Sequence, residues 1–133
     1  MHLTTASRTI QQAVGQRSFS VSAAAASATA AKKQFLVVAW DHTDGEALNR
    51  RLSVRPAHMK GALELKESKT LQLGGAILTD HTENGKMKGS IMIFNADSED
   101  EVRKLVEKDQ YVVGKVWEKY DIYPFRTAPN PYA

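Results

Sequence analysis

The chain has no cysteine, which excludes disulfide bonds, a thiolate nucleophile and cysteine-ligated metals. It also has no stretch of roughly 18 apolar residues, so we expect no membrane-spanning segment and no membrane partner. Acidic residues are missing until Asp41, whereas four of the 18 basic residues lie in residues 1–34. The rest of the chain therefore carries 14 basic against 15 acidic side chains. Because this body is nearly neutral, no nucleic-acid partner is expected despite the sequence pI of about 9.2.

Residues 1–34 have the composition of a mitochondrial presequence, with arginine and abundant serine and alanine but no acid. Apolar residues at 3, 10 and 14 share one helical face, with Arg8 roughly opposite. The stretch 17–20 is typical of a matrix-protease cleavage site. The sequence thus predicts a mitochondrial matrix protein after removal of the presequence. The alternative is a disordered leader without a targeting role, since alanine and serine bury too little apolar surface to fold alone.

The body predicts alternating strands and helices. A continuous apolar run at 35–40 predicts a strand covered on both faces or nearly so. Residues 46–67 predict a helix, although Pro56 lacks the amide that would bond Leu52. We expect either a kink there or a helix that restarts with Ser53 as its cap.

The second half predicts a hairpin, a helix and a final strand. Strands are expected at 70–79 and 88–95, joined by a turn at Asn84-Gly85. Ser98 and Glu101 form a capping box that begins a second helix. A last strand is expected at 116–125, where Pro124 indicates a sheet edge.

This βαββαβ order predicts an α+β protein of the ferredoxin-like type, with two helices on one face of a four-stranded antiparallel sheet. The domain is expected at 35–127, between the leader and a C-terminal tail at 128–133. Because the strands are apolar on both sides, we expect the open face to pair with a second copy, as a homodimer that forms a dimeric α+β barrel. The alternative is a monomer with a solvated sheet face.

The first helix holds charge where its pattern predicts hydrocarbon. Arg51, Arg55 and His58 fall inside its apolar sector on a helical wheel. A buried cation or imidazole needs a partner, so the cluster predicts a core ion pair or a polar pocket. The apolar members of the sector are Leu48, Leu52, Val54, Met59, Ala62, Leu63 and Leu65.

His58 is the strongest candidate for a catalytic group, because an imidazole exchanges a proton near neutral pH once a partner fixes its tautomer. Asp109, just after the second helix, is the expected partner, pointing between the helix and the sheet. The alternative is a structural histidine. A polar cluster at Asp41, His42, Asp44 and Glu46 suggests a metal site only superficially, and we interpret it as a solvated loop without metal.

The segment 48–58, with its Arg-x-x-His ending, resembles the YciI-like (YCII-related) family. The similarity continues at 73–75, 109–112 and 123–125 and covers about residues 35–127. Gly75 and Gln110 depart from the family, which has proline at both places. The resemblance implies a dimeric α+β barrel with His58 and Asp109 as an acid/base pair in a cleft, and one branch of the family resembles a dehydrochlorinase that acts on a hydroxylated aromatic.

Other residues are candidates for substrate contacts. Arg51 and Arg55 would hold a carboxylate or enolate oxygen, or instead an ion pair to Asp109 or Glu118. Gly74 and Gly75 would let a ligand approach the backbone, or would only shape a bulge. Tyr111 would supply a phenol or only pack.

The predicted function is proton abstraction, with elimination or isomerisation, on a small oxygenated organic compound. The alternative is a non-catalytic ligand-binding or interaction module on the same fold. Neither function requires a cofactor.

Overall fold

A computed structural model describes residues 32–130 of the chain. Its elements are β1 (Lys33–Asp41), α2 (Ala47–Glu67), β2 (Leu71–Leu78), β3 (Met87–Ala96), α3 (Glu99–Glu107), α4 (Gln110–Val113) and β4 (Trp117–Phe125). The expected βαββαβ order is confirmed, with the short α4 as an addition. Apart from its last three residues, the predicted presequence lies outside the described residues, as does the end of the predicted C-terminal tail.

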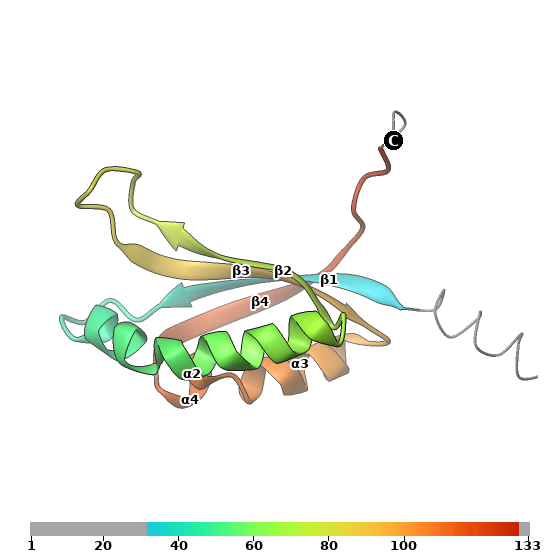
Figure 1. The fold of residues 1–133 in the computed structure, drawn as a ribbon, viewed down its shortest axis with the longest axis horizontal. Helices are drawn as coiled ribbons and strands as arrows, with labels where there is room; N and C mark the ends of the chain where they lie inside the picture. The colour runs from blue at the N-terminus through green and yellow to red at the C-terminus, as the bar shows by residue number, and fades with distance from the viewer. Residues whose placement is uncertain (1–31, 131–133) are drawn as a thin grey trace, which may run out of the picture. The chain divides into compact units, whose positions relative to one another are not determined.

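The four strands form one antiparallel sheet in the order β2-β3-β1-β4. The three helices lie on the same side of this sheet (Figure 1). The predicted ferredoxin-like α+β fold is therefore confirmed. Strand β4 lies at an edge of the sheet, as Pro124 indicates, because an edge strand tolerates a residue without an amide.

The sheet has one buried and one open face, because successive side chains of a strand point to opposite sides. Phe35 and Val37 of β1 are buried beneath the helices, beside Phe94 and Met92 of β3. Between them, residues such as Leu36 point to the open face and are only partly buried. The core is completed by Ala39, Leu71, Ala96, Val102, Val106, Tyr111, Val116 and Trp117.

Helix α2 follows its hydrophobic pattern only in part. Its buried residues are Ala47 and Arg51, whereas Leu52, Met59 and Leu63 are 51%, 48% and 58% exposed. The helix also continues without a break through Pro56, so the predicted restart at Ser53 is wrong. Consequently, α2 turns Arg51 toward the sheet together with the apolar residues Val54, Ala62 and Leu65, which pack against the core. A stripe of other large apolar side chains remains outside.

Helix α3 begins as the capping box predicts. The Ser98 hydroxyl accepts a hydrogen bond from the Glu101 amide at 3.2 Å, and the Glu101 carboxylate accepts one from the Asp97 amide at 3.1 Å. The first contact satisfies an amide of the first turn, and the second satisfies the amide of the residue before the N-cap. Within residues 32–130, no helix has the length and hydropathy needed to cross a membrane.

Candidate active site

His58 and Asp109 meet across 51 residues of sequence. The Nδ1 atom of His58 lies 2.7 Å from Oδ1 of Asp109, and the two side chains are only 13% and 15% exposed. Because a carboxylate can only accept, this contact requires a proton on Nδ1 and leaves the Nε2 atom of the neutral ring with a free lone pair. The arrangement that orients a general base is therefore present.

The position of Asp109 is fixed by the short helix that follows it. Its Oδ1 also accepts a hydrogen bond from the Tyr111 amide at 2.9 Å, so Asp109 caps α4. The family's proline would stand at Gln110, inside this first turn. Gln110 is an exposed residue, and the cap holds the carboxylate in place without the proline.

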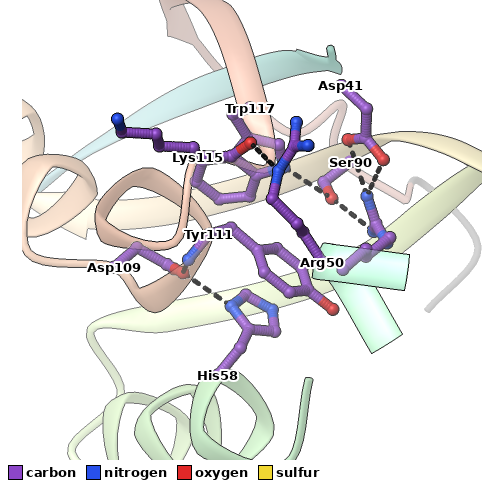
Figure 2. A network of polar contacts seen from close by, with 9 residues as sticks. Asp41, Arg50, His58, Ser90, Asp109, Tyr111, Lys115 and Trp117 are labelled. Carbon is purple, nitrogen blue, oxygen red and sulfur yellow. Dashed lines mark hydrogen bonds and ion pairs between the residues drawn. The ribbon is translucent and has the colours of Figure 1, made fainter. Parts of the chain in front are cut away.

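Tyr111 lies beside the His58 ring (Figure 2) and connects it to the buried Arg51. The His58 and Tyr111 rings stack with centroids 3.7 Å apart and planes 9° from parallel. The guanidinium carbon of Arg51 lies over the same phenol ring, 4.6 Å from its centroid. Trp117 contacts both rings edge-on. These contacts restrict the plane of the imidazole as well as its position.

Arg51 belongs to a buried polar network with Asp41, Ser90 and Trp117. Figure 2 labels the side chains of these three partners. Its Nη1 donates to both carboxylate oxygens of Asp41, at 2.8 and 2.9 Å, and its Nη2 donates to the Ser90 hydroxyl at 2.8 Å. The Trp117 indole also donates to Ser90, at 3.2 Å. Among the described residues, the buried Nε of Arg51 has no partner. The alternative of an ion pair from Arg51 to Asp109 or Glu118 is wrong, because Asp41, at the end of strand β1, is its partner.

Asp41 was also misassigned to a solvated loop. It is 7% exposed, and burial raises the pKa of its carboxyl, although the hydrogen bond from Arg51 opposes the shift. Asp44, in the following loop, is exposed and accepts two hydrogen bonds from Arg50 at 2.8 Å. These bonds hold the pKa of the Asp44 carboxyl below its ordinary range. The loop interpretation is therefore correct for Asp44 and wrong for Asp41.

Ser90 and Trp117 are further members of this network that were not predicted from the sequence. One available signal was the two-residue period of β1, since Asp41 continues the face that begins with Phe35 and Val37. The same period places Ser90 on the buried face of β3. No pattern in the sequence indicates that the Trp117 indole bonds Ser90.

A cavity of about 170 Å³ lies between α2 and strands β2 and β3. Its lining includes every residue predicted for the site. These are Arg51, Arg55, His58, Gly74, Gly75, Asp109 and Tyr111. Most of the remaining lining is apolar, which is typical of small-molecule sites, where few polar groups orient a ligand.

The two glycines do not form the expected bulge. Gly74 and Gly75 pair regularly with Met92 and Ile91, and the register shifts fall on either side of them. A methyl group at Gly75 would meet no atom within 4 Å, and at Gly74 it would make only ordinary contacts. Their side of the cavity is therefore open because side chains are absent, and neither position requires glycine for its backbone.

Arg55 lines the cavity and differs from Arg51 in its surroundings. It is exposed, and among residues 32–130 it has neither a hydrogen-bond nor an ion-pair partner. Its charge still acts on the site, because Arg51 and Arg55 both oppose the rise that burial produces in the pKa of the Tyr111 phenol. Arg51 is neutralised by Asp41, whereas Arg55 remains free to bind an anion.

This arrangement lies within a segment shared with known proteins. The YCII-related domain matches residues 35–126. Fusaric acid biosynthesis protein 2 of Gibberella fujikuroi is 30% identical over 100 residues, which cover 71% of this chain and 94% of that protein. An aspartate kinase of Fusarium oxysporum f. sp. lycopersici is 32% identical over 101 residues, or 72% of this chain. The chain spans only 18% of the length of that kinase.

A solved structure is also similar. It is the 5-chloro-2-hydroxyhydroquinone dehydrochlorinase of Burkholderia phenoliruptrix, in complex with 2,5-dihydroxybenzoquinone. The two sequences are 28% identical, and the structures superpose with a TM-score of 0.63. The match covers 71% of this chain and 95% of that enzyme.

Proposed function

The chain belongs to the YCII-related domain family, and from this premise we propose that it is an acid-base enzyme acting on a small oxygenated organic compound. The observation that carries the proposal is the 2.7 Å contact between His58 and Asp109 at the wall of a cavity. Asp109 holds the proton on Nδ1, so the Nε2 atom of His58 abstracts a proton from the substrate. Arg55 stabilises the oxyanion that develops.

The proposed reaction class is proton abstraction followed by elimination or isomerisation. Support comes from the similar structure of a dehydrochlorinase. In such an elimination, His58 takes a proton from carbon or oxygen, and the electron pair of that bond forms a new double bond. The leaving group departs with the electron pair of the bond that joined it to carbon.

Chloride release from 5-chloro-2-hydroxyhydroquinone provides a direct test. We expect turnover by the full chain and a fall of about 10²-fold or more in His58→Asn, since a positioned general base contributes roughly 10² to 10⁴. His42→Asn is the matched control, because His42 also lies near a carboxylate, that of Glu118 at 3.6 Å, but does not line this cavity. Equal losses in both variants, or no turnover above background, would reject the proposal.

The role of Asp109 has a readout that does not require turnover. Ring ¹⁵N chemical shifts report which nitrogen of His58 carries the proton. We expect the Nδ1-protonated tautomer in the wild type and a mixture in Asp109→Ala, because the alanine cannot accept that proton. An unchanged tautomer would show that Asp109 does not orient the ring, and the site would then fit the alternative of a non-catalytic binding module.

We further propose that two copies associate through the open sheet face. Leu36, Val38, Ile91 and Ile93 lie at its centre, and Leu73 at its edge is 50% exposed. A contiguous apolar face of this kind is rare on a monomer. Light scattering should give twice the chain mass for the wild type and for a control, Leu63→Glu on α2, but the single mass for Ile93→Glu. A wild-type monomer at micromolar concentration would exclude the dimer.

Mitochondrial localisation is likewise a proposal, supported by the composition of residues 1–34. The expected form in its native source begins near residue 20. Mass spectrometry of that protein is the test, and an intact Met1 would remove the claim.

A further inference from the structure

We infer that the Tyr111 hydroxyl is a third group that contacts the substrate, and that it donates a hydrogen bond to the same oxygen atom that Arg55 stabilises. The inference rests on the proposed function, because it adds a donor to that site. Three observations carry it. The Tyr111 ring is held in one position, its hydroxyl has no partner, and the charges around it favour a negatively charged oxygen.

The Tyr111 ring is held on several sides. The backbone amide of Tyr111 donates to Asp109, and its carbonyl accepts a hydrogen bond from the Val116 amide at 2.9 Å. The ring stacks on His58 and meets Trp117 edge-on, with those two centroids 5.4 Å apart. Only 1% of Tyr111 is exposed. A ring restrained in this way presents its hydroxyl at one place, as a preorganised donor must.

The Tyr111 hydroxyl makes no hydrogen bond within residues 32–130, although a buried tyrosine ordinarily finds a partner for this group. The hydroxyl is not fully enclosed, since the Nε of Arg51 is the fully buried side-chain polar atom that lacks a partner in the described part of the chain. Figure 2 shows the hydroxyl at the free end of the ring, and no dashed line reaches it. Because Tyr111 lines the cavity, its hydroxyl is available to a molecule bound there.

The charges near this hydroxyl favour an anion as its acceptor. Burial raises the pKa of the Tyr111 phenol above 10.0, so the phenol keeps its proton at neutral pH and can donate it. Arg51 and Arg55 oppose that rise, and the carboxylates of Asp109 and Asp41 act against the arginines more weakly. A negative charge at this place is therefore favoured by its charged neighbours. A substrate oxygen one hydrogen bond away would experience the same positive charges.

The hydrogen bond from Tyr111 strengthens as the substrate loses its proton to His58. The charge that this proton leaves behind develops on a substrate oxygen, and a donor already fixed beside that oxygen needs no reorganisation. Tyr111 stays protonated throughout, so His58 moves the proton and Tyr111 acts as a donor only. A hydroxylated ring, whose oxygen becomes a phenolate or a quinone carbonyl, supplies an acceptor of this kind.

The probe is 4-nitrophenol, because its absorbance reports whether its oxygen is ionised. Titration of the full chain should show that Tyr111→Phe binds it about 10- to 100-fold more weakly than the wild type, the factor expected for a lost hydrogen bond to a charged acceptor. The phenylalanine keeps the ring and its stacking on His58. By contrast, 4-nitrotoluene, which has a methyl group in place of the phenol oxygen, should bind both proteins equally well.

The ionisation of the bound probe separates a contact with substrate from a structural role. The absorbance midpoint of bound 4-nitrophenol should lie at a lower pH in the wild type than in Tyr111→Phe, because a hydrogen bond to the anion favours the anion. A tyrosine that only packs against His58 would not produce this difference.

Tyr120→Phe is the matched control. Tyr120 also packs against the core, but its hydroxyl donates to Glu107 and it does not line the cavity. This variant should bind 4-nitrophenol as the wild type does. Ring ¹⁵N shifts of His58 should be the same in wild type and Tyr111→Phe, since the stacked ring is retained. If Tyr111→Phe does not fold, the ¹³Cζ shift of Tyr111 in the wild type should respond to 4-nitrophenol and not to 4-nitrotoluene.

The inference is overturned if the wild type does not bind 4-nitrophenol at millimolar concentration, if Tyr111→Phe binds it as tightly, or if the variant loses affinity equally for 4-nitrotoluene. Its failure is distinct from failure of the proposed function. Binding that depends on the Tyr111 hydroxyl, by a chain that releases no chloride, would reject the catalytic proposal alone. Equal chloride release and equal 4-nitrophenol affinity in wild type and Tyr111→Phe would reject the role of Tyr111 alone.

Discussion

Replacing Asp41 by alanine should be among the most destabilising single changes in this protein. The substitution leaves the Arg51 guanidinium charged, with its side chain only 3% exposed and without its counterion. Breaking a buried ion pair in this way costs about 3 to 5 kcal/mol. A domain of this size has a free energy of unfolding of about 5 to 15 kcal/mol. We therefore expect a large part of the stability to be lost.

Urea unfolding at neutral pH, followed by tryptophan fluorescence, is the assay. At a slope of about 2 kcal/mol per molar urea, the midpoint of Asp41→Ala should fall by roughly 2 M. The double variant Asp41→Leu/Arg51→Met should lose less than either single variant, because no uncompensated charge remains in the interior.

A neighbouring pair supplies the matched control. Arg50 and Asp44 form a similar two-bond contact in the same part of the chain, but at the surface. Asp44→Ala should move the midpoint far less, since water solvates the arginine that it leaves behind. Equal midpoints for Asp41→Ala and Asp44→Ala, or additive losses in the double variant, would refute the reasoning.

Three further predictions concern titration and glycine. The hydrogen bonds from Arg50 lower the pKa of the Asp44 carboxyl below the ordinary 3.8. The stability that this carboxylate contributes is therefore present above about pH 4 and is lost as the pH falls. Melting temperatures of Asp44→Asn and wild type should accordingly converge toward about pH 2. Burial raises the pKa of Tyr111 above 10.0, so wild-type stability should fall more steeply than that of Tyr111→Phe as the pH rises past about 10, and parallel curves would contradict this. Gly61→Ala should raise the free energy of unfolding by about 1 kcal/mol, since alanine favours the helix and its methyl group meets nothing within 4 Å. Gly89→Ala should lower the free energy of unfolding, because the added Cβ would lie 2.6 Å from a backbone oxygen of β1.

The element order was predictable because each segment has a distinct local signal. The capping box at Ser98 begins α3, and the alternation of β3 separates its buried face from its open face. Pairing of His58 with Asp109 was also predictable, since a histidine in an apolar sector requires a partner and few carboxylates lie at a helix junction.

The orientation of α2 was less accessible to the sequence. A helical wheel assumes that the apolar sector faces the protein interior, but here part of that interior is a cavity lined by polar as well as apolar side chains. Leu52 and Leu63 therefore remain outside while Arg51 is buried. The partner of Arg51 was missed because Asp41 ends its strand, where a carboxylate resembles the start of a loop.

Ser90 has one consequence for any molecule that occupies the cavity. Its hydroxyl oxygen receives hydrogen bonds from both Arg51 and Trp117, and a hydroxyl oxygen has only two lone pairs. Neither of these partners can accept a bond in return. The Ser90 proton must therefore be directed elsewhere, and Ser90 borders the cavity. A molecule that offers an acceptor atom at this depth would satisfy that proton, whereas one that offers only a donor would be disfavoured.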